Sequence, residues 1–361
     1  MDSRERLKRC YSHQELDRPA ICFWASFPKN DPSYDKLKTY VNEYTDLRPG
    51  WNGRRFESEY SYDTYTEPYS KDYERVVTTL HTPNGDLTAT SLSGLNNQPG
   101  LHESYFIKDE DDIEKYLSLP LPIIAGGDIS KFFEMDKKLG NRGIVDIRLG
   151  SNPGGFVAEL MGSENFAIMT VTNRDLVHEL CERQMKVIMN AVKYLLQNNV
   201  QPFFSVVGEE YIVPPLHGPC DFYDFNVKYD KPIFDLIHNA SGRVRVHSHG
   251  SVNKVLQGFI DSGADVLHPF EAPPMGDVIP SEAKSLIRGR LCFEGNIQIN
   301  TLYENKPESI KETTSNLITD VFDDRKDLIV CATASPYLAG EGDRCFEQYK
   351  AMIDTVIHWK L

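Results

Sequence analysis

The sequence lacks the features that define several classes of protein. Its seven cysteines include no Cys-x-x-Cys pair, which argues against a zinc ribbon, and their odd number argues against a framework of disulfides. No apolar run approaches the roughly 18 residues of a membrane span, and the amino-terminal segment MDSRERLKRCYSHQ is too polar for a secretion signal. We therefore expect a cytoplasmic protein with reduced thiols and no membrane partner.

Positive charge is also scarce. The chain has 39 Lys and Arg against 53 Asp and Glu, a net charge of −14, whereas proteins that follow phosphate backbones carry an excess of basic residues. We therefore expect no nucleic-acid partner. The 361 residues contain no sequence repeat and no Ser/Gly-rich linker. We expect a single domain that spans residues 1–361.

The sequence does contain a regular alternation of strand and helix patterns. Short apolar runs are typical of strands, and segments with helical spacing follow most of them. This alternation indicates an α/β protein, and its length favours a single (β/α)8 barrel of the TIM type over two doubly wound domains. The eight predicted strands lie near residues 20, 58, 145, 204, 245, 266, 293 and 329.

The amino-terminal region interrupts the alternation. Residues 73–94 fit a β-hairpin with Asn84-Gly85 at its turn. Before it, Tyr60, Tyr62, Tyr65 and Tyr69 fit either a half-buried edge strand or the lining of a pocket, and the half-buried edge strand is the simpler interpretation. We predict an irregular hairpin region attached to the barrel.

The stretch from residue 242 to 270 carries the strongest chemical signal. His247 and His249 come directly after the β-branched strand from Val244 to Val246. Side chains two apart on a strand share a face, and the carboxyl ends of parallel strands hold the active sites of α/β proteins. We therefore predict that both imidazoles face the mouth of the barrel.

This stretch also carries a family resemblance. The motif HSHG, a following helix and SGADVLHP resemble the core of the uroporphyrinogen decarboxylase-like superfamily. The segment RERLKRCYSHQELDRPAICFW resembles the opening of that superfamily, where a short helix leads through Asp-Arg-x-Pro into a strand. The resemblance covers nearly the whole chain and itself implies the barrel. The motif is most similar to the zinc-dependent methyltransferases that serve corrinoid proteins, in which a cysteine commonly stands where this chain has His249.

The histidine pair and the resemblance together predict a metal site. Catalytic zinc commonly takes three protein ligands and leaves a fourth position open. His247 and His249 supply two ligands, and the third is Glu210, at the end of the preceding strand, or Cys331, at the end of the last strand. We favour Glu210 because neighbouring strand ends lie close together. Zinc is the expected metal, and iron, cobalt and manganese stay open.

Other polar residues near strand ends are candidates for catalysis and substrate binding. Asp146 and Arg148 share one face of a strand and form either a structural ion pair or part of the catalytic apparatus. Glu209 and Glu210 are adjacent, so only one of them can face the mouth from an extended chain; Glu209 is the catalytic candidate. The candidate substrate-binding residues are Tyr211, His268, Glu271, Asn296 and Gln298.

Three functions fit these observations. The resemblance implies a metal-dependent methyltransferase that moves a methyl group between a small methylated substrate and a corrinoid on a partner protein. The alternative within the superfamily is a decarboxylase of uroporphyrinogen. That substrate needs basic residues, yet ASFPKNDPSY, with Lys29 as its single base, stands in place of the arginine-rich segment of true decarboxylases. The third possibility is a non-catalytic barrel that binds a small ligand. We expect the methyltransferase.

Overall fold

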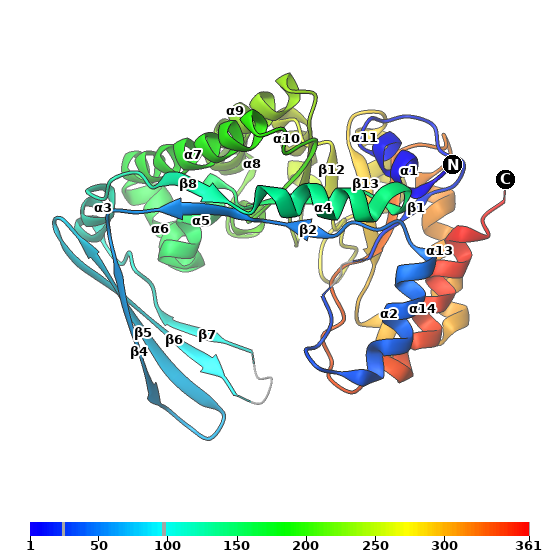
Figure 1. Ribbon diagram of the computed structural model, residues 1–361, viewed down its shortest axis with the longest axis horizontal. Helices are drawn as coiled ribbons and strands as arrows, with labels where there is room; N and C mark the ends of the chain where they lie inside the picture. Colours follow the sequence, from blue (N-terminus) through cyan, green and yellow to red (C-terminus); the bar gives the residue numbers. More distant parts are fainter. Residues whose placement is uncertain (24–25, 96–98, 361) are drawn as a thin grey trace.

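An eight-stranded parallel sheet forms the centre of the computed structural model, which describes residues 1–23, 26–95 and 99–360 (Figure 1). The hydrogen-bonded order is β1-β14-β13-β12-β11-β10-β9-β2, so the strands follow one another around the sheet in chain order. Their apolar runs are buried on both faces, as is typical of parallel sheets covered by helices. The strands are β1 (Ala20–Ile21), β2 (Gly50–Trp51), β9 (Asp146–Ser151), β10 (Phe203–Val207), β11 (Arg243–His247), β12 (Val266–His268), β13 (Cys292–Ile297) and β14 (Leu328–Ala332).

The two edge strands of this curled sheet do not form a ladder with each other among the described residues. The Asp46 backbone amide, shortly before β2, donates a hydrogen bond of 2.8 Å to the carbonyl oxygen of Ile21 in β1. Strands β1 and β2 have only two residues each, which leaves little backbone for pairing. The predicted α/β class and the eight-stranded parallel sheet are confirmed, and the closed barrel stays a prediction.

One predicted strand of the central sheet is wrong. The segment near residue 58 contains β3 (Arg54–Glu57), which pairs antiparallel with β8 (Ile123–Gly127) in a separate two-stranded sheet. The central sheet uses Gly50–Trp51 in its place, and a two-residue strand shows no periodicity that a sequence pattern can detect. The first strand is confirmed at Ala20–Ile21, while Trp24, at the end of the predicted run, lies outside the described residues.

The hairpin region forms a four-stranded antiparallel sheet that projects from the body at the lower left of Figure 1. The hairpin over residues 73–94 is confirmed, with Gly85 at a φ of 119° in its turn. The tyrosine-rich strand is an edge strand, as predicted, but all its residues are exposed, so the expected half-burial is wrong. Tyr60 and Tyr62 also line a cavity of about 270 Å³. The strands, in order, are β4 (Tyr62–Pro68), β5 (Tyr73–Thr82), β6 (Gly85–Gly94) and β7 (Leu101–Ser104).

Helices connect most of the strands, largely where helical spacing predicts them. Among the described residues, no helix is long and apolar enough to cross a membrane, and all seven cysteines are free thiols. The helices are α1 (Ser3–Cys10), α2 (Asp35–Tyr44), α3 (Glu110–Leu117), α4 (Ile129–Leu139), α5 (Pro153–Met161), α6 (Ser163–Thr172), α7 (Arg174–Gln197), α8 (Pro219–Phe222), α9 (Lys228–Asn239), α10 (Leu256–Ser262), α11 (Pro280–Ile287), α12 (Thr301–Glu304), α13 (Pro307–Val321) and α14 (Gly342–Ile357).

Strand register determines which side chains share the concave face of the sheet. Arg245 and His247 alternate with the buried Val244 and Val246 along β11, so the two polar residues share one face. His247 lies in register with His268 on the neighbouring strand β12. The fold therefore places charged and imidazole groups inside the curl of the sheet, toward the carboxyl ends of its strands.

Candidate metal centre at the strand ends

His247 and His249 lie together at the carboxyl end of β11. The centroids of their rings are 4.7 Å apart and the ring planes are nearly perpendicular, at 88°. His247 is the last residue of the strand and is half-buried, whereas the side chain of His249 is 40% exposed. The spacing of the two histidines thus brings their rings to one place at the edge of the sheet.

Two carboxylates surround His249. Its Nδ1 lies 3.2 Å from Oε1 of Glu271, and the other oxygen of Glu271 accepts a hydrogen bond of 2.9 Å from the Gly250 amide. Burial alone would lower the pKa of His249, but the hydrogen bond and charge of Glu271 and the charge of Glu210 raise it overall. The exposed side of the histidine pair is therefore acidic.

Glu209 and Glu210 face different surroundings, as the sequence predicts for adjacent residues. Glu210 is half-buried, its carboxylate accepts a hydrogen bond of 3.1 Å from the Gly208 amide, and its charge acts on His249. Glu209 is 1% exposed, and burial and the charge of Asp230 raise its pKa well above the ordinary value. The Glu209 carboxyl group is thus enclosed near a second acid, and its catalytic role stays a prediction.

His268 lies beneath the pair and contacts His247. The Nδ1 atoms of the two rings are 2.8 Å apart, and Nε2 of His268 is 3.1 Å from the carbonyl oxygen of Ala332, the last residue of β14. His268 is fully buried. Burial and the charge of Arg245 lower the pKa of His268, the charge of Glu294 raises it, and the resulting pKa is about 3. A predicted substrate-binding residue is thus enclosed between two strands.

A buried ion network that the sequence pattern does not reveal lies deeper in the sheet. Glu294 on β13 is fully buried and accepts hydrogen bonds from Arg245 Nε at 2.7 Å, Arg245 Nη2 at 3.1 Å and Arg48 Nη1 at 2.9 Å, with a further bond from Arg48 Nη2. Burial alone would raise the pKa of Glu294, but Arg245 and Arg48 hold it well below the ordinary value. Both carboxylate oxygens are therefore occupied by guanidinium groups.

Among the described residues, one group of side chains brings three potential metal-ligand atoms together. This inner set is His268, Glu294 and Cys331, which offer ligand atoms within 4.8 Å of one another. Both oxygens of Glu294 already accept hydrogen bonds from the guanidinium groups of Arg48 and Arg245, whose positive charge opposes a divalent cation there. A second set, which we call the outer set, is His247 and His249 with Glu271, which contacts His249, and Glu210, whose charge acts on His249; its ligand atoms do not form a described group of three within 4.8 Å of one another. Its nitrogen and oxygen donors and its negative charge suit zinc or a similar divalent metal.

The predicted third ligands therefore differ in their placement. Cys331 is fully buried in the inner set, where its thiol lies near His268 and Glu294. Glu210 belongs to the outer set, because its charge acts on His249. Of the two, Cys331 lies in the group of converging ligand atoms, and the choice between Glu210 and Cys331 as third ligand stays a prediction.

A cavity of about 290 Å³ lies beside Tyr211, the residue that follows Glu210 in the chain. The predicted substrate-binding residue Tyr211 lines it together with Glu159 of α5, and His102 and Tyr105, at and just after β7, complete its wall. The charge of Glu159 contributes to raising the pKa of both Glu210 and Tyr211, which links the cavity electrostatically to the histidine pair. The hairpin region thus supplies part of a pocket beside Tyr211.

The remaining predicted residues have mainly structural contacts. Asp146 is buried at the start of β9, which is the end of the strand remote from the rim. Its Oδ2 lies 3.8 Å from Nε of Arg148, so the two residues form a long ion pair. The side-chain amide of Asn296 donates a hydrogen bond of 2.8 Å to the carbonyl oxygen of Phe270. The amide of Gln298 donates one of 3.3 Å to the carbonyl oxygen of Ala272. The two amides hold the loop that carries Glu271, and their substrate-binding role stays a prediction.

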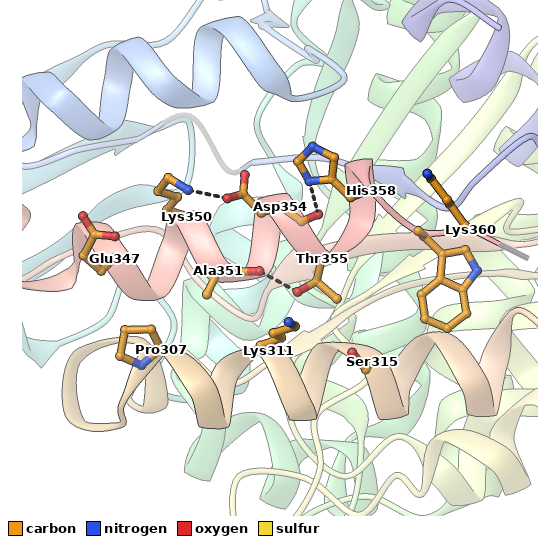
Figure 2. A pocket seen from close by; sticks show the side chains of 11 residues that line it. Pro307, Lys311, Ser315, Glu347, Lys350, Ala351, Asp354, Thr355, His358 and Lys360 are labelled. Carbon is orange, nitrogen blue, oxygen red and sulfur yellow. Dashed lines mark hydrogen bonds and ion pairs between the residues drawn. The ribbon is translucent and has the colours of Figure 1, made fainter.

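A second concavity lies away from these residues. Figure 2 shows a groove of about 490 Å³ between α13 and α14, where Lys350 pairs with Asp354 and His358 Nδ1 contacts the carbonyl oxygen of the same aspartate. Its lining comes from these two helices and the segment after α14, and no strand-end residue takes part. The groove is therefore separate from the candidate metal centre.

Sequence reasoning missed Glu294, Arg48, Arg245 and Glu159. A signal was present for three of them. Arg245 shares the strand face of His247, and Glu159 interrupts the apolar helix after the loop that ends β9. Glu294 stands alone in an apolar strand, which also marks a buried charge in need of a partner. Only the register of distant strands shows which partners it has.

Comparison with known proteins gives two findings. The model of the family described as Uroporphyrinogen decarboxylase (URO-D) matches residues 153–334. Among solved structures, the chain is similar to a methyltransferase from Methanosarcina mazei, with a TM-score of 0.60, 13% identity and 98% of each chain covered. That similarity indicates the same fold over the whole chain. No curated protein matches the sequence.

Two further solved structures are similar to this chain at lower TM-scores. The 3-keto-D-glucoside 4-epimerase YcjR from E. coli has a TM-score of 0.38 and 12% identity, over 63% of this chain and 94% of that one. A D-psicose 3-epimerase has a TM-score of 0.38 and 8% identity, over 63% of this chain and 81% of that one.

Proposed function

Because this chain belongs to the uroporphyrinogen decarboxylase (URO-D) family, we propose that it is a metal-dependent methyltransferase of that family. It moves a methyl group between a small methylated substrate and a corrinoid carried by a partner protein. The observation that supports the proposal is the outer set, in which two imidazoles at the end of β11 lie beside the carboxylates of Glu210 and Glu271. Zinc bound there supplies a Lewis acid for the leaving or accepting heteroatom of methyl transfer.

The residues around the metal position have distinct roles in this proposal. His247, His249 and Glu210 bind the metal, and Glu271 orients His249 through its hydrogen bond. The cavity beside Tyr211 receives the small substrate. Its wall combines the carboxylate of Glu159 with the ring of Tyr211, a combination that favours a substrate with a positive charge, because carboxylates and aromatic faces both attract cations.

The decarboxylase alternative has weaker support because the basic residues near the site are already engaged. Arg48 and Arg245 both bond to Glu294 inside the sheet. Arg54 donates to the carbonyl oxygens of Arg148 and Leu149 at the end of β9. Acidic side chains line the mouth instead, and they would repel a substrate with several carboxylates. We therefore favour methyl transfer.

Anaerobic methyl transfer to cob(I)alamin tests the proposal. The zinc-loaded protein is mixed with cob(I)alamin and a panel of methylated amines, thioethers and methyl ethers, and loss of cob(I)alamin absorbance is followed as methylcob(III)alamin forms. We expect turnover with at least one cationic methylated amine and none with the matched His247→Ala variant. Release of carbon dioxide from uroporphyrinogen by the metal-free protein, with no methyl transfer to cobalamin, would contradict the proposal.

A further inference from the structure

A further cavity, of about 270 Å³, lies between α7 and β3. Strand β8, the partner of β3, lies along α7 (Figure 1). Helices α3 and α5 contribute Tyr116 and Phe156 to the wall. The cavity shares no lining residue with the cavity beside Tyr211. The protein thus contains a pocket that the proposed methyl transfer does not use.

Aromatic rings form much of the wall of this cavity. Phe56 of β3 and Phe156 of α5 line it, and Tyr60, Tyr62 and Tyr116 add three rings that carry hydroxyl groups. Burial raises the pKa of Tyr116, and the charges of Tyr60 and Tyr62 add to the effect, so the three phenols lie near one another. Such a lining suits a flat apolar body, and the hydroxyl groups can donate hydrogen bonds to polar atoms on it.

Two arginines also line the cavity, and neither forms an ion pair within the described part of the chain. Arg54 donates to the carbonyl oxygens of Arg148 and Leu149, and its buried Nε has no hydrogen-bond partner among the described residues. Nη2 of Arg183 donates a hydrogen bond of 2.7 Å to the carbonyl oxygen of Pro120. A carbonyl oxygen satisfies an N–H group but carries no net charge, so the two positive charges are not neutralised.

This lack of a counter-charge is unusual for the chain. The buried guanidinium groups of Arg6, Arg48 and Arg245 each pair with a carboxylate, and a net charge of −14 shows that carboxylates are not scarce. Burial lowers the pKa of Arg54 to about 10, which leaves the side chain charged at neutral pH. A half-buried cation without a carboxylate therefore indicates a position for an anion from outside the chain.

We propose that this cavity binds a small aromatic acid, an anion with one ring or two fused rings and a single carboxylate or phosphate group. The ring packs among the aromatic side chains, and the acidic group pairs with Arg54 and Arg183. Sites for small ligands have volumes of roughly 300–1,000 Å³, and this cavity lies at the lower end of that range. It therefore has room for a ligand of this size and not for a tetrapyrrole. The inference does not rest on the proposed methyl transfer.

Calorimetric titration tests the need for an anion with matched probes. Indole-3-acetate carries a carboxylate, indole-3-acetamide has nearly the same shape without the charge, and phenyl phosphate supplies the other acidic group. We expect at least one of the two acids to bind with a Kd below about 1 mM, and indole-3-acetamide to bind at least about ten-fold more weakly than that acid. Equal binding of the acid and the amide, or no binding of either acid at about 5 mM, would overturn the inference.

A matched pair of substitutions tests the position of the anion. Arg54→Met removes a charge from the wall of the cavity, whereas Arg55→Met removes the same charge from the exposed neighbouring residue, which does not line it. Loss of a charged hydrogen bond weakens binding about 10- to 100-fold. We expect that loss for the bound acid in Arg54→Met and little change in Arg55→Met. Equal affinities in the two variants would overturn the inference.

Two further variants keep the test decisive. Arg183→Met on α7 should also weaken binding of the acid, and it serves as the test where Arg54→Met does not fold. His247→Ala should bind the acid as wild type does, because the histidine does not line the cavity. Loss of acid binding in His247→Ala would place the acid at the candidate metal centre and overturn the inference. A wild type that binds the acid but no zinc would contradict the proposed function alone.

Discussion

Replacement of Glu294 by glutamine tests the buried ion network beneath the histidines. The Glu294 carboxylate is fully buried and accepts hydrogen bonds from Arg48 and Arg245. Glutamine keeps the shape but not the charge, and its amide group turns a donor toward guanidinium groups that can only donate. Two buried cations then lack their counter-charge, and removal of one partner from a buried ion pair costs about 3–5 kcal/mol of stability.

Thermal unfolding at pH 7 measures this loss. The entropy of unfolding is about 2.1 cal/mol/K per residue over 361 residues. With this entropy, a loss of about 3–5 kcal/mol of stability corresponds to a fall in Tm of about 4–7 °C for Glu294→Gln. The control is Glu312→Gln on the exposed surface of α13, where a surface substitution should change Tm by less than about 1 °C. If Glu294→Gln lowers Tm no more than this control, the network does not stabilise the sheet as argued.

The pH dependence of this effect has a definite sign. Burial would raise the pKa of Glu294, but Arg245 and Arg48 hold it well below the ordinary value in the folded protein. The stability that Glu294 contributes is therefore fully present above its unfolded pKa of about 4.3 and is lost as the pH falls toward the folded pKa. Urea unfolding should show a difference between wild type and Glu294→Gln that is constant from pH 7 to about 5 and shrinks below about 4.

Two further substitutions test the site and the fold. Glu271→Gln removes the negative charge that helps to raise the pKa of His249, so the pKa of that histidine should fall in a magnetic resonance titration of the metal-free protein; an unchanged pKa would refute the pairing. Gly85→Ala forces an L side chain to a φ of 119° with only Lys115 within 4 Å, so it should cost about 1–2 kcal/mol in urea unfolding through backbone strain alone. Gly218→Ala, at a φ of −90° in open space, is the control and should leave the unfolding free energy nearly unchanged.

Local patterns were sufficient to predict much of this architecture. The positions of His247 and His249 follow from alternation along one strand, and the hairpin follows from Asn84-Gly85 between two alternating runs. Each of these features depends on residues that are close in the sequence. That is why composition and spacing alone indicated both an α/β sheet and a histidine pair at its carboxyl edge.

The features that could not be predicted depend on long-range register or on very short elements. Glu294 meets Arg48 across 246 positions and Arg245 across 49, and no local pattern relates residues at such separations. The second strand of the central sheet has only two residues, Gly50 and Trp51. The turn that begins at Gly208, with its φ of 106°, buries Glu209 and leaves Glu210 half-buried. Backbone geometry of this kind is not visible in the sequence.

The zinc content of the purified protein tests the central claim most directly. After removal of excess metal by dialysis, elemental analysis should find about one zinc per chain of wild type and almost none in His247→Ala. Glu210→Gln should retain zinc at least about ten-fold more weakly, whereas Cys331→Ser should retain it nearly as wild type does. Equal zinc in wild type and His247→Ala, or loss in Cys331→Ser with none in Glu210→Gln, would contradict a metal centre built from His247, His249 and Glu210.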